Sequence, residues 1–384
     1  MTGGDEARAG RGPGEGVTEP PVLRHVEGRA GFLTLNRPRA LNSLNHTMVN
    51  AVESALIEWA DDPSVETVVL TGAGERGLCA GGDIRAIYDD LLTGGPAAEA
   101  SERFWHDEYR MNARIGRFAK PYVAVMDGLV LGGGVGISAH GDIRVVTERS
   151  LVGMPETTIG FVPDVGGTYL LSRAPGELGT HLALTAAPVG AADALLCGLA
   201  DHFVPSQSLP ALLTELATEP AAEVVARHTT TPPVAELAAA RAWIDHCYAA
   251  DSVEEILRRL RSAGVPEAEA AARTILTKSP NSLKVTLAAL RRARELGSLE
   301  EVLRQEYRVS CAALAAPDLV EGVRAQVVDK DRDPKWSPAT LQEVHEADVA
   351  RYFAARPGRE LVLPGDDGDG SGGSDDTSGA DTSR

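Results

Sequence analysis

The 384-residue sequence predicts an α/β core followed by a mostly helical region. Short, almost wholly apolar segments, typical of strands buried on both faces, alternate with helical patterns between residues 31 and 147. After Gly198 the pattern changes to Ala-rich helices, which continue to about residue 355. A strand–helix–strand order is typical of a core with crossover connections, so the fold class expected is α/β.

Each element of the core has a local reason. Proline at position 38 ends the first strand, and the Asn and Ser of "LNSLN" supply caps for the helix that follows. Gly-rich stretches punctuate the later strands. The predicted elements are a strand at 31–36, a helix at 48–60, a strand at 66–72, a turn at 72–83, a helix at 84–92, a strand at 121–128, a turn at 132–134 and a strand at 143–147.

The remainder of the chain divides by composition. Residues 279–315 predict two amphipathic helices, each behind Ser or Asn caps. The C-terminal stretch is rich in Gly, Ser and Asp and too poor in apolar side chains to offset the entropy of ordering. The predicted organisation is a disordered leader at 1–20, a core at 21–205, a mostly helical region at 206–362 and a disordered acidic tail at 363–384.

The charge of the chain limits its partners. The formal net charge is −18, of which the last twenty residues carry −5 and the first twenty −2, leaving about −11 for the body. Binding of nucleic acid needs a basic footprint, so a nucleic-acid partner is not expected. An anionic small ligand is still compatible with this charge, because local Arg side chains and backbone N–H groups can bind one.

Cysteine spacing and hydropathy indicate the setting. The four cysteines are isolated, with no CxxC and no His at ligand spacing, so neither a zinc site nor a disulfide framework is expected. No stretch of about 18 apolar residues is present to span a membrane. The N-terminal segment lacks an apolar stretch and contains acids early, which counts against a targeting signal. The expectation is a cytoplasmic protein that binds no membrane.

Two Gly-rich turns are candidate binding sites. Gly134, Gly136 and Ala139 satisfy the dinucleotide-binding pattern G-x-G-x-x-A. Only six residues separate Gly136 from the strand that begins at 143, however, and these are too few for the crossover helix of a dinucleotide site. "CAGGD" at 79–83 and "GGG" at 132–134 each follow a buried strand and open a short helix. Free N–H groups at two such turns can form an oxyanion hole, while either turn taken alone is better explained as a tight strand-to-helix connection.

Three carboxylates are candidate catalytic groups. Glu108 shares the apolar stripe of the predicted helix 101–115, where it either lies at the stripe's edge or points into a pocket. Glu156 and Asp164 lie in 154–171, a segment with no Lys or Arg. A surface turn would explain Glu156 and a helix N-cap would explain Asp164. Two carboxylates in an apolar pocket instead suit acid/base chemistry, because burial and mutual repulsion raise a pKa.

These motifs resemble a known family. The segments "NRPRALNSLN", "CAGGDI", "DGLVLGGGVGI", "MPETTIGFVPDVGGTYLLSR" and "GLADHFVP" occur in this order. Together they resemble the crotonase (enoyl-CoA hydratase/isomerase) superfamily, most closely its 3-hydroxyisobutyryl-CoA hydrolase branch. The later "SPNSLKVT" and "DKDRDPKWSP" are similar to the same branch, so the resemblance covers roughly residues 21–338.

The resemblance implies a spiral of ββα turns whose core binds an acyl-CoA. Carried over by motif, the oxyanion donors would be the backbone N–H groups of Ala80 and Gly133. Hydratases of this family use two glutamates, one just after the glycine triplet and one in the "PE" segment. Here the first position is Gly136, while the second, Glu156, is present. Water addition to an enoyl thioester therefore lacks one of its two carboxylates.

The resemblance also implies roles for the other two acids. The "PE…PDVGG" pairing is similar to the hydrolase branch and places Asp164 in the site, and Glu108 matches that branch's additional acidic contact. The activity implied is hydrolysis of a short 3-hydroxyacyl-CoA, preferably 3-hydroxyisobutyryl-CoA to 3-hydroxyisobutyrate and CoA in valine catabolism. Asp164 and Glu108 would hydrogen-bond the 3-hydroxyl group, while Glu156 would act as nucleophile or as base.

No metal or cofactor is implied, since coenzyme A is part of the substrate. A homo-oligomer, a trimer or hexamer as in relatives, is also expected. Two alternatives remain open: an enoyl-CoA hydratase or isomerase acting on another acyl-CoA, and a non-catalytic acyl-CoA-binding subunit.

Overall fold

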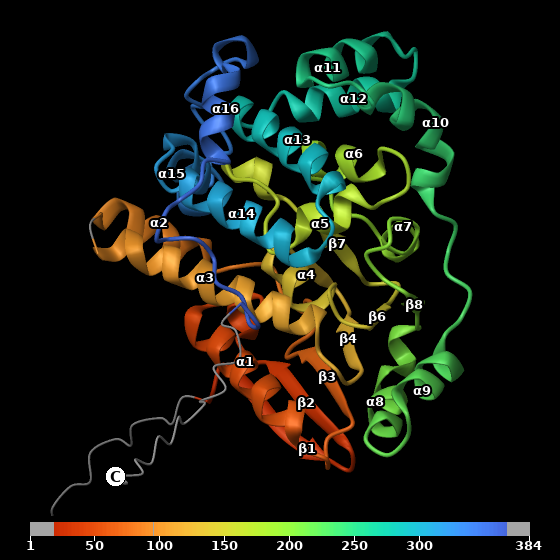
Figure 1. Ribbon diagram of the computed structural model, residues 1–384. Helices are drawn as coiled ribbons and strands as arrows, with labels where there is room; N and C mark the ends of the chain where they lie inside the picture. Colours follow the sequence, from red (N-terminus) through yellow and green to blue (C-terminus); the bar gives the residue numbers. More distant parts are fainter. Residues whose placement is uncertain (1–18, 95, 367–384) are drawn as a thin grey trace, which may run out of the picture.

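The computed structural model describes residues 19–94 and 96–366 (Figure 1). The predicted leader and tail therefore lie outside the described residues, except for 19–20 and 363–366. The residues of the tail that are described belong to the packed structure. Leu363 is buried, and the Asp366 carboxylate accepts hydrogen bonds from the Arg304 guanidinium at 2.6 and 2.7 Å. The packed chain thus continues past the predicted boundary at 363.

A six-stranded sheet forms the base of the molecule (Figure 1). Its spatial order is β1-β2-β3-β4-β6-β8; β1 runs antiparallel to β2, and the other neighbours are parallel. Four of the strands match predicted ones, while β1 and β8 were not predicted. The strands are β1 (Val22–Glu27), β2 (Ala30–Leu35), β3 (Thr67–Gly72), β4 (Tyr122–Met126), β6 (Ile143–Val146) and β8 (His202–Phe203).

Except at the largely exposed edge strand β1, both faces of this sheet are covered, which explains the near-continuous apolar runs in strands such as β3 and β4. Side chains alternate along a strand, so Phe32 and Leu33 of β2 point to opposite faces. Phe32 packs with the apolar side chains of α8 (Leu209–Leu216) and α9 (Ala221–His228), whereas Leu33 belongs to the main core with α1 (His46–Asp61). The predicted cap of α1 is present, because the Asn45 side chain accepts a hydrogen bond from the Met48 N–H group.

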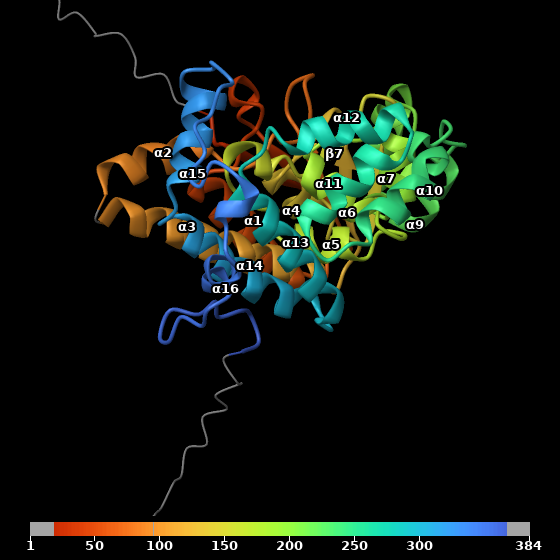
Figure 2. The same cartoon turned by 90° about the horizontal axis from the view of Figure 1, so that it is seen from above.

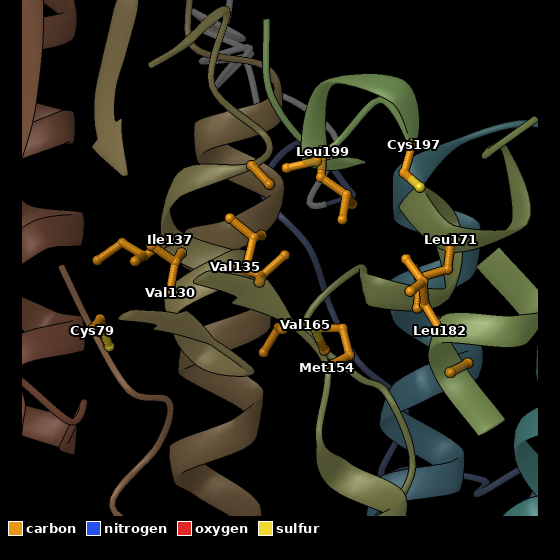
Figure 3. Packing of buried hydrophobic residues seen from close by; sticks show 14 of the residues in the cluster. Cys79, Val130, Val135, Ile137, Met154, Val165, Leu171, Leu182, Cys197 and Leu199 are labelled. Carbon is orange, nitrogen blue, oxygen red and sulfur yellow. The ribbon is translucent and has the colours of Figure 1, made fainter. Parts of the chain in front are cut away.

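A second, smaller sheet lies at the centre and places the two glycine turns side by side. Its strands β5 (Leu129–Leu131) and β7 (Leu151–Gly153) are parallel, and the chain at Cys79 continues the sheet by pairing with Val130. Figure 3 shows Cys79, Val130 and Val135 within one apolar cluster. Because 79–83 and 132–134 leave neighbouring strands at the same edge, both turns open toward the same space.

The helices before residue 200 fill the spiral between the strands. They are α1, α2 (Ile84–Thr93), α3 (Pro96–Gly116), α4 (Gly133–Ser138), α5 (Gly167–Ser172), α6 (Leu178–Thr185) and α7 (Ala191–Leu196), with 3₁₀ turns η1 (Pro38–Ala40) and η2 (Glu156–Ile159).

The chain after β8 is helical and packs back on the core (Figures 1 and 2). Helix α14 lies against α3 and α5, α13 against α5 and α6, and α15 against α2 and η2. Besides α8 and α9, the elements are η3 (Ser206–Ser208), α10 (Glu236–Tyr248), α11 (Val253–Ser262), α12 (Pro266–Ile275), α13 (Pro280–Glu295), α14 (Leu299–Ala313), α15 (Pro317–Val323), the π-turn η4 (Arg324–Val328), η5 (Leu341–Glu343) and α16 (Glu346–Tyr352).

Candidate active site

A cavity of about 170 Å³ opens between the two glycine turns, helix α3, the segment 155–165 and helix α15. Its walls are largely apolar, formed among others by Trp105 and Phe161, whose rings stack with centroids 5.1 Å apart. Leu319 and Val323 of α15 close it from the C-terminal region. The cavity has room for a short acyl group.

Three carboxylates line this one cavity. Glu108, Glu156 and Asp164 are only 2%, 6% and 5% exposed. Oε1 of Glu108 and Oε2 of Glu156 are fully buried and accept no hydrogen bond from any described residue. Buried polar atoms are normally paired, so these oxygens are candidates to bind a ligand. The structure thus brings together the three acids, and neither the edge of a stripe nor a surface turn accounts for Glu108 or Glu156.

The glycine triplet allows two of the carboxylates to approach the backbone. A Cβ atom added at Gly132 would lie 2.6 Å from Glu156 Oε1, and one added at Gly133 would lie 2.8 Å from Glu108 Oε1. Both distances are too short for carbon against oxygen. Gly132 also has a left-handed φ of 51°, which favours glycine.

Asp164 is held by a tyrosine rather than by a helix end. The Tyr109 hydroxyl donates a hydrogen bond of 2.7 Å to Asp164 Oδ2 and lies 2.7 Å from the Ser310 hydroxyl oxygen. The N-cap residue of α5 is Gly166, so the capping interpretation of Asp164 is wrong. Tyr109 follows Glu108 on α3, and one helix therefore supplies both a carboxylate and the partner of a second one.

Burial dominates the titration of these acids. Desolvation raises the pKa of Glu108 and of Glu156 well above the usual range, and the nearby Asp164 carboxylate raises both further. Desolvation also raises the pKa of Asp164 to about 7, against the opposing effect of the Tyr109 hydrogen bond. Groups with such perturbed pKa values in a cavity are candidates for acid/base chemistry.

The first glycine turn differs from the prediction by two residues. The Ala80 N–H group donates to the Leu41 carbonyl oxygen at 3.0 Å, so it is not a free donor and its predicted role in an oxyanion hole is wrong. The N–H groups of Gly82 and Gly133, by contrast, donate to no acceptor among residues 19–94 and 96–366. A Cβ at Gly133 would lie 3.2 Å from the Gly82 nitrogen, which shows how close the two turns come. The donor pair that the structure presents is therefore Gly82 and Gly133.

No side chain fits at position 136. A Cβ there would lie 2.6 Å from Cβ of Val165 and 3.1 Å from Nδ2 of Asn112. The space that a glutamate would need is filled by these two side chains. The absence of a carboxylate at this position is thus built into the packing.

The turn that carries Asp164 is strained. Val165 has a left-handed φ of 52°, unfavourable for a β-branched residue, and Gly166 follows with a φ of 81°. Strain of this kind costs about 1–3 kcal/mol and persists only where surrounding contacts enforce it. One such contact joins the Val165 carbonyl oxygen to Nε2 of His140, 2.7 Å apart, and burial lowers the pKa of His140 to about 4.

A second contact comes from a residue that the sequence interpretation missed. The Glu306 carboxylate of α14, only 1% exposed, accepts hydrogen bonds from the Gly166 N–H at 2.6 Å and from the Thr168 N–H and hydroxyl at 2.9 and 2.6 Å. Desolvation raises the pKa of Glu306 to about 8, against the opposing effect of these bonds. Like Glu108, it is a carboxylate on an apolar helical stripe, between Leu303 and Val309, and that signal was available in the sequence.

Other classes of site are not found in the described part of the chain. No group of three or more His, Cys, Asp or Glu side chains there is arranged to hold a metal ion. Over the same residues, no helix combines the length and the apolar character needed to cross a membrane.

Fold and site together define a class: an α/β spiral in which two glycine turns and several buried carboxylates face one cavity. The chain matches the family described as enoyl-CoA hydratase/isomerase over residues 30–353. It is 41% identical over 358 residues to the mitochondrial 3-hydroxyisobutyryl-CoA hydrolase of Xenopus tropicalis, covering 90% of this chain and 92% of that protein.

Two solved structures are similar over nearly the whole chain. The carnitinyl-CoA dehydratase from Mycobacterium thermoresistibile is 54% identical, with a TM-score of 0.86, covering 90% of this chain and 99% of that one. The enoyl-CoA hydratase from Rhodobacter sphaeroides is 39% identical, with a TM-score of 0.84, covering 89% and 100%. The chain belongs to the enoyl-CoA hydratase/isomerase family, and the predicted crotonase-like fold is confirmed.

Proposed function

We propose that this protein hydrolyses the thioester of a short 3-hydroxyacyl-CoA, with 3-hydroxyisobutyryl-CoA as substrate and 3-hydroxyisobutyrate and CoA as products, the reaction of valine catabolism. The observation that carries this proposal is the combination of three buried acids and two free N–H groups around one small cavity, with no carboxylate at position 136. The hydrolase of Xenopus tropicalis, similar over 92% of its length, supports the same reaction.

The geometry suggests a role in the reaction for each of these residues. The thioester oxygen accepts hydrogen bonds from the N–H groups of Gly82 and Gly133, which stabilise the negative charge that develops on it. Glu156, beside Gly132, acts on the carbonyl carbon as nucleophile or as base for water. The C–S bond breaks, the acyl carbon gains a water-derived hydroxyl oxygen, and CoA leaves with a proton. No metal or redox cofactor takes part in this proposal.

The other two acids select the substrate. Glu108 has an unpartnered buried oxygen, and Asp164 keeps one oxygen that Tyr109 does not engage. A 3-hydroxyl group donates to one of these acceptors, whereas an acyl group without it leaves them desolvated and unpaired. Selection against non-hydroxylated esters follows from this loss.

Hydration or dehydration of an acyl-CoA is the second candidate, because the two solved relatives carry such names. Hydratases of the family use two glutamates, and the space for the first is filled here by Val165 and Asn112. This packing favours hydrolysis. A binding-only subunit is the third candidate, and three acids kept buried against their desolvation cost count against it.

Free thiol release from a panel of esters separates these candidates. The panel is 3-hydroxyisobutyryl-, 3-hydroxypropionyl-, isobutyryl- and crotonyl-CoA, with the enoyl absorbance of crotonyl-CoA followed in parallel. Thiol from the hydroxylated esters alone is the expected result. Loss of enoyl absorbance without thiol would establish a hydratase. In Glu156→Ala, thiol release should disappear while binding of the ester survives.

Location and assembly complete the proposal. A reducing, cytoplasmic setting is supported by the four cysteines, all free and buried. The name of the Xenopus tropicalis hydrolase places that protein in mitochondria. A trimer or hexamer remains the proposed assembly, to be checked by light scattering on the purified chain.

A further inference from the structure

Helix α14 reaches the site from far along the chain. Its residue Glu306 is separated by 140 positions from Gly166, and its carboxylate accepts a hydrogen bond from the Gly166 N–H group. Four residues later on the same face, Ser310 contacts the Tyr109 hydroxyl that binds Asp164. Figures 1 and 2 show α14 lying along α3 and beside α5. One helix of the C-terminal region thus reaches the Asp164 turn directly through Glu306 and indirectly through Ser310 and Tyr109.

The contacts of Glu306 are made to the strained segment of that turn. Val165 and Gly166 take left-handed φ values in succession, and the Glu306 carboxylate accepts hydrogen bonds from the N–H groups of Gly166 and Thr168. Its two oxygens divide the donors: Oε2 accepts from Gly166, and Oε1 accepts from the N–H and hydroxyl groups of Thr168. All the hydrogen bonds that this carboxylate accepts come from residues 166 and 168, just after Asp164, and Glu306 is not part of the cavity wall.

We propose that Glu306 is a positioning residue: by clamping the strained Val165–Gly166 turn, it aims the Asp164 carboxylate at the 3-hydroxyl group of the substrate. This inference rests on the proposed function for the identity of the ligand. It assigns to α14 a part in substrate discrimination, and it separates Glu306 from the acids that touch the substrate.

The test is Glu306→Gln, with Glu300→Gln as matched control. Glutamine keeps the size of the side chain but presents an NH₂ group, which cannot accept the Gly166 or Thr168 hydrogens, so part of the clamp is lost. Glu300 is a second acid on α14, 8% exposed, and pairs with Arg117 instead of with the turn. In Glu306→Gln, we expect kcat/KM for 3-hydroxyisobutyryl-CoA to fall at least tenfold and the preference over isobutyryl-CoA to fall by a similar factor. Glu300→Gln should keep both.

A double-mutant cycle distinguishes positioning from general damage. If Glu306 acts through Asp164, adding Glu306→Gln to Asp164→Asn should cost little more than Asp164→Asn alone. Losses that multiply, or a Glu306→Gln variant that slows both esters equally, would overturn the inference. Thr168→Val removes only one donor to Glu306, and it should shift the substrate preference in the same direction by a smaller factor. If Glu306→Gln does not fold, this milder variant decides the question, and an unchanged preference in it would overturn the inference.

The outcome is separable from the fate of the proposed function. Should the wild-type chain release thiol from no ester, hydrolysis is refuted directly. The cycle is then run on binding of two thioether analogues of the esters, one with and one without the hydroxyl group. Loss of the preference for the hydroxylated analogue in Glu306→Gln supports the clamp, and an unchanged preference refutes it.

Discussion

Gly133→Ala is a sharp test of the oxyanion hole, because the added methyl group would lie close to both the Gly82 N–H donor and the Glu108 carboxylate. Its Cβ atom would lie 2.8 Å from Glu108 Oε1 and 3.2 Å from the Gly82 nitrogen. The carboxylate must move, and the methyl group covers the Gly82 donor. Blocking one donor of such a pair costs about 2.7–4 kcal/mol, a loss of roughly 100- to 1,000-fold in kcat. Position 133 is not among those with a left-handed φ, so alanine adds no backbone strain there.

The assay is thiol release from 3-hydroxyisobutyryl-CoA, with the melting temperature measured on the same samples. Gly190→Ala is the matched control, because Gly190 has a φ of −73° and no atom within 4 Å of an added Cβ. It should keep both the rate and the stability. If Gly133→Ala stays folded and keeps kcat within threefold of the wild type, the pairing of Gly82 with Gly133 is refuted.

Three further predictions follow from the packing and the titration of the site. Gly136→Glu should lower the melting temperature and create no hydration of crotonyl-CoA, measured by enoyl absorbance, because Cβ at 136 overlaps Val165. Trp105→Ala should raise the ratio of kcat/KM for a 3-hydroxyhexanoyl ester to kcat/KM for 3-hydroxyisobutyryl-CoA by tenfold or more, because it opens the cavity wall that Trp105 forms with Phe161. An unchanged ratio would show that another part of the cavity limits the length of the acyl group. Asp164→Asn should be more stable than the wild type at pH 8, by at most about 4 kcal/mol, and nearly equal to it at pH 4. A folded-state pKa raised from 3.8 to about 7 means that stability is lost as the pH rises through this window, and thermal melts of both proteins at the two pH values check the sign.

Much of the core and three of the acids could be predicted from the sequence. Buried parallel strands leave long apolar runs, and a carboxylate such as Glu108 on an apolar stripe is visible in one helical window. Glu156 and Asp164 stood out because their segment has no cation to pair with them. These signals are local, so a single sequence contains them.

The errors and omissions have a different origin. The sequence does not show which N–H group of "CAGGD" is free, because this depends on a distant residue. The Leu41 carbonyl oxygen accepts a hydrogen bond from the Ala80 N–H group. The contacts of Glu306 depend in the same way on a pairing over 140 residues. The left-handed Val165 contradicts its own backbone preference and is enforced only by tertiary contacts. Sequence patterns predict which residues are unusual, whereas the partner that explains them comes from the fold.

The burial of the acids links the stability of this site to its selectivity. Desolvation raises the pKa of Glu108, Glu156 and Asp164, which means that each charge, when present, destabilises the empty site. A ligand that donates a hydrogen bond to an unpartnered oxygen relieves that cost, and a ligand without a donor does not. The free energy lost by burying the acids is therefore recovered only with a hydroxylated acyl group. On this reasoning, the Glu306 clamp matters because it keeps the Asp164 carboxylate from turning toward a hydrogen-bond donor of the protein. An Asp164 carboxylate that found such a donor would no longer favour a hydroxylated acyl group over one without the hydroxyl.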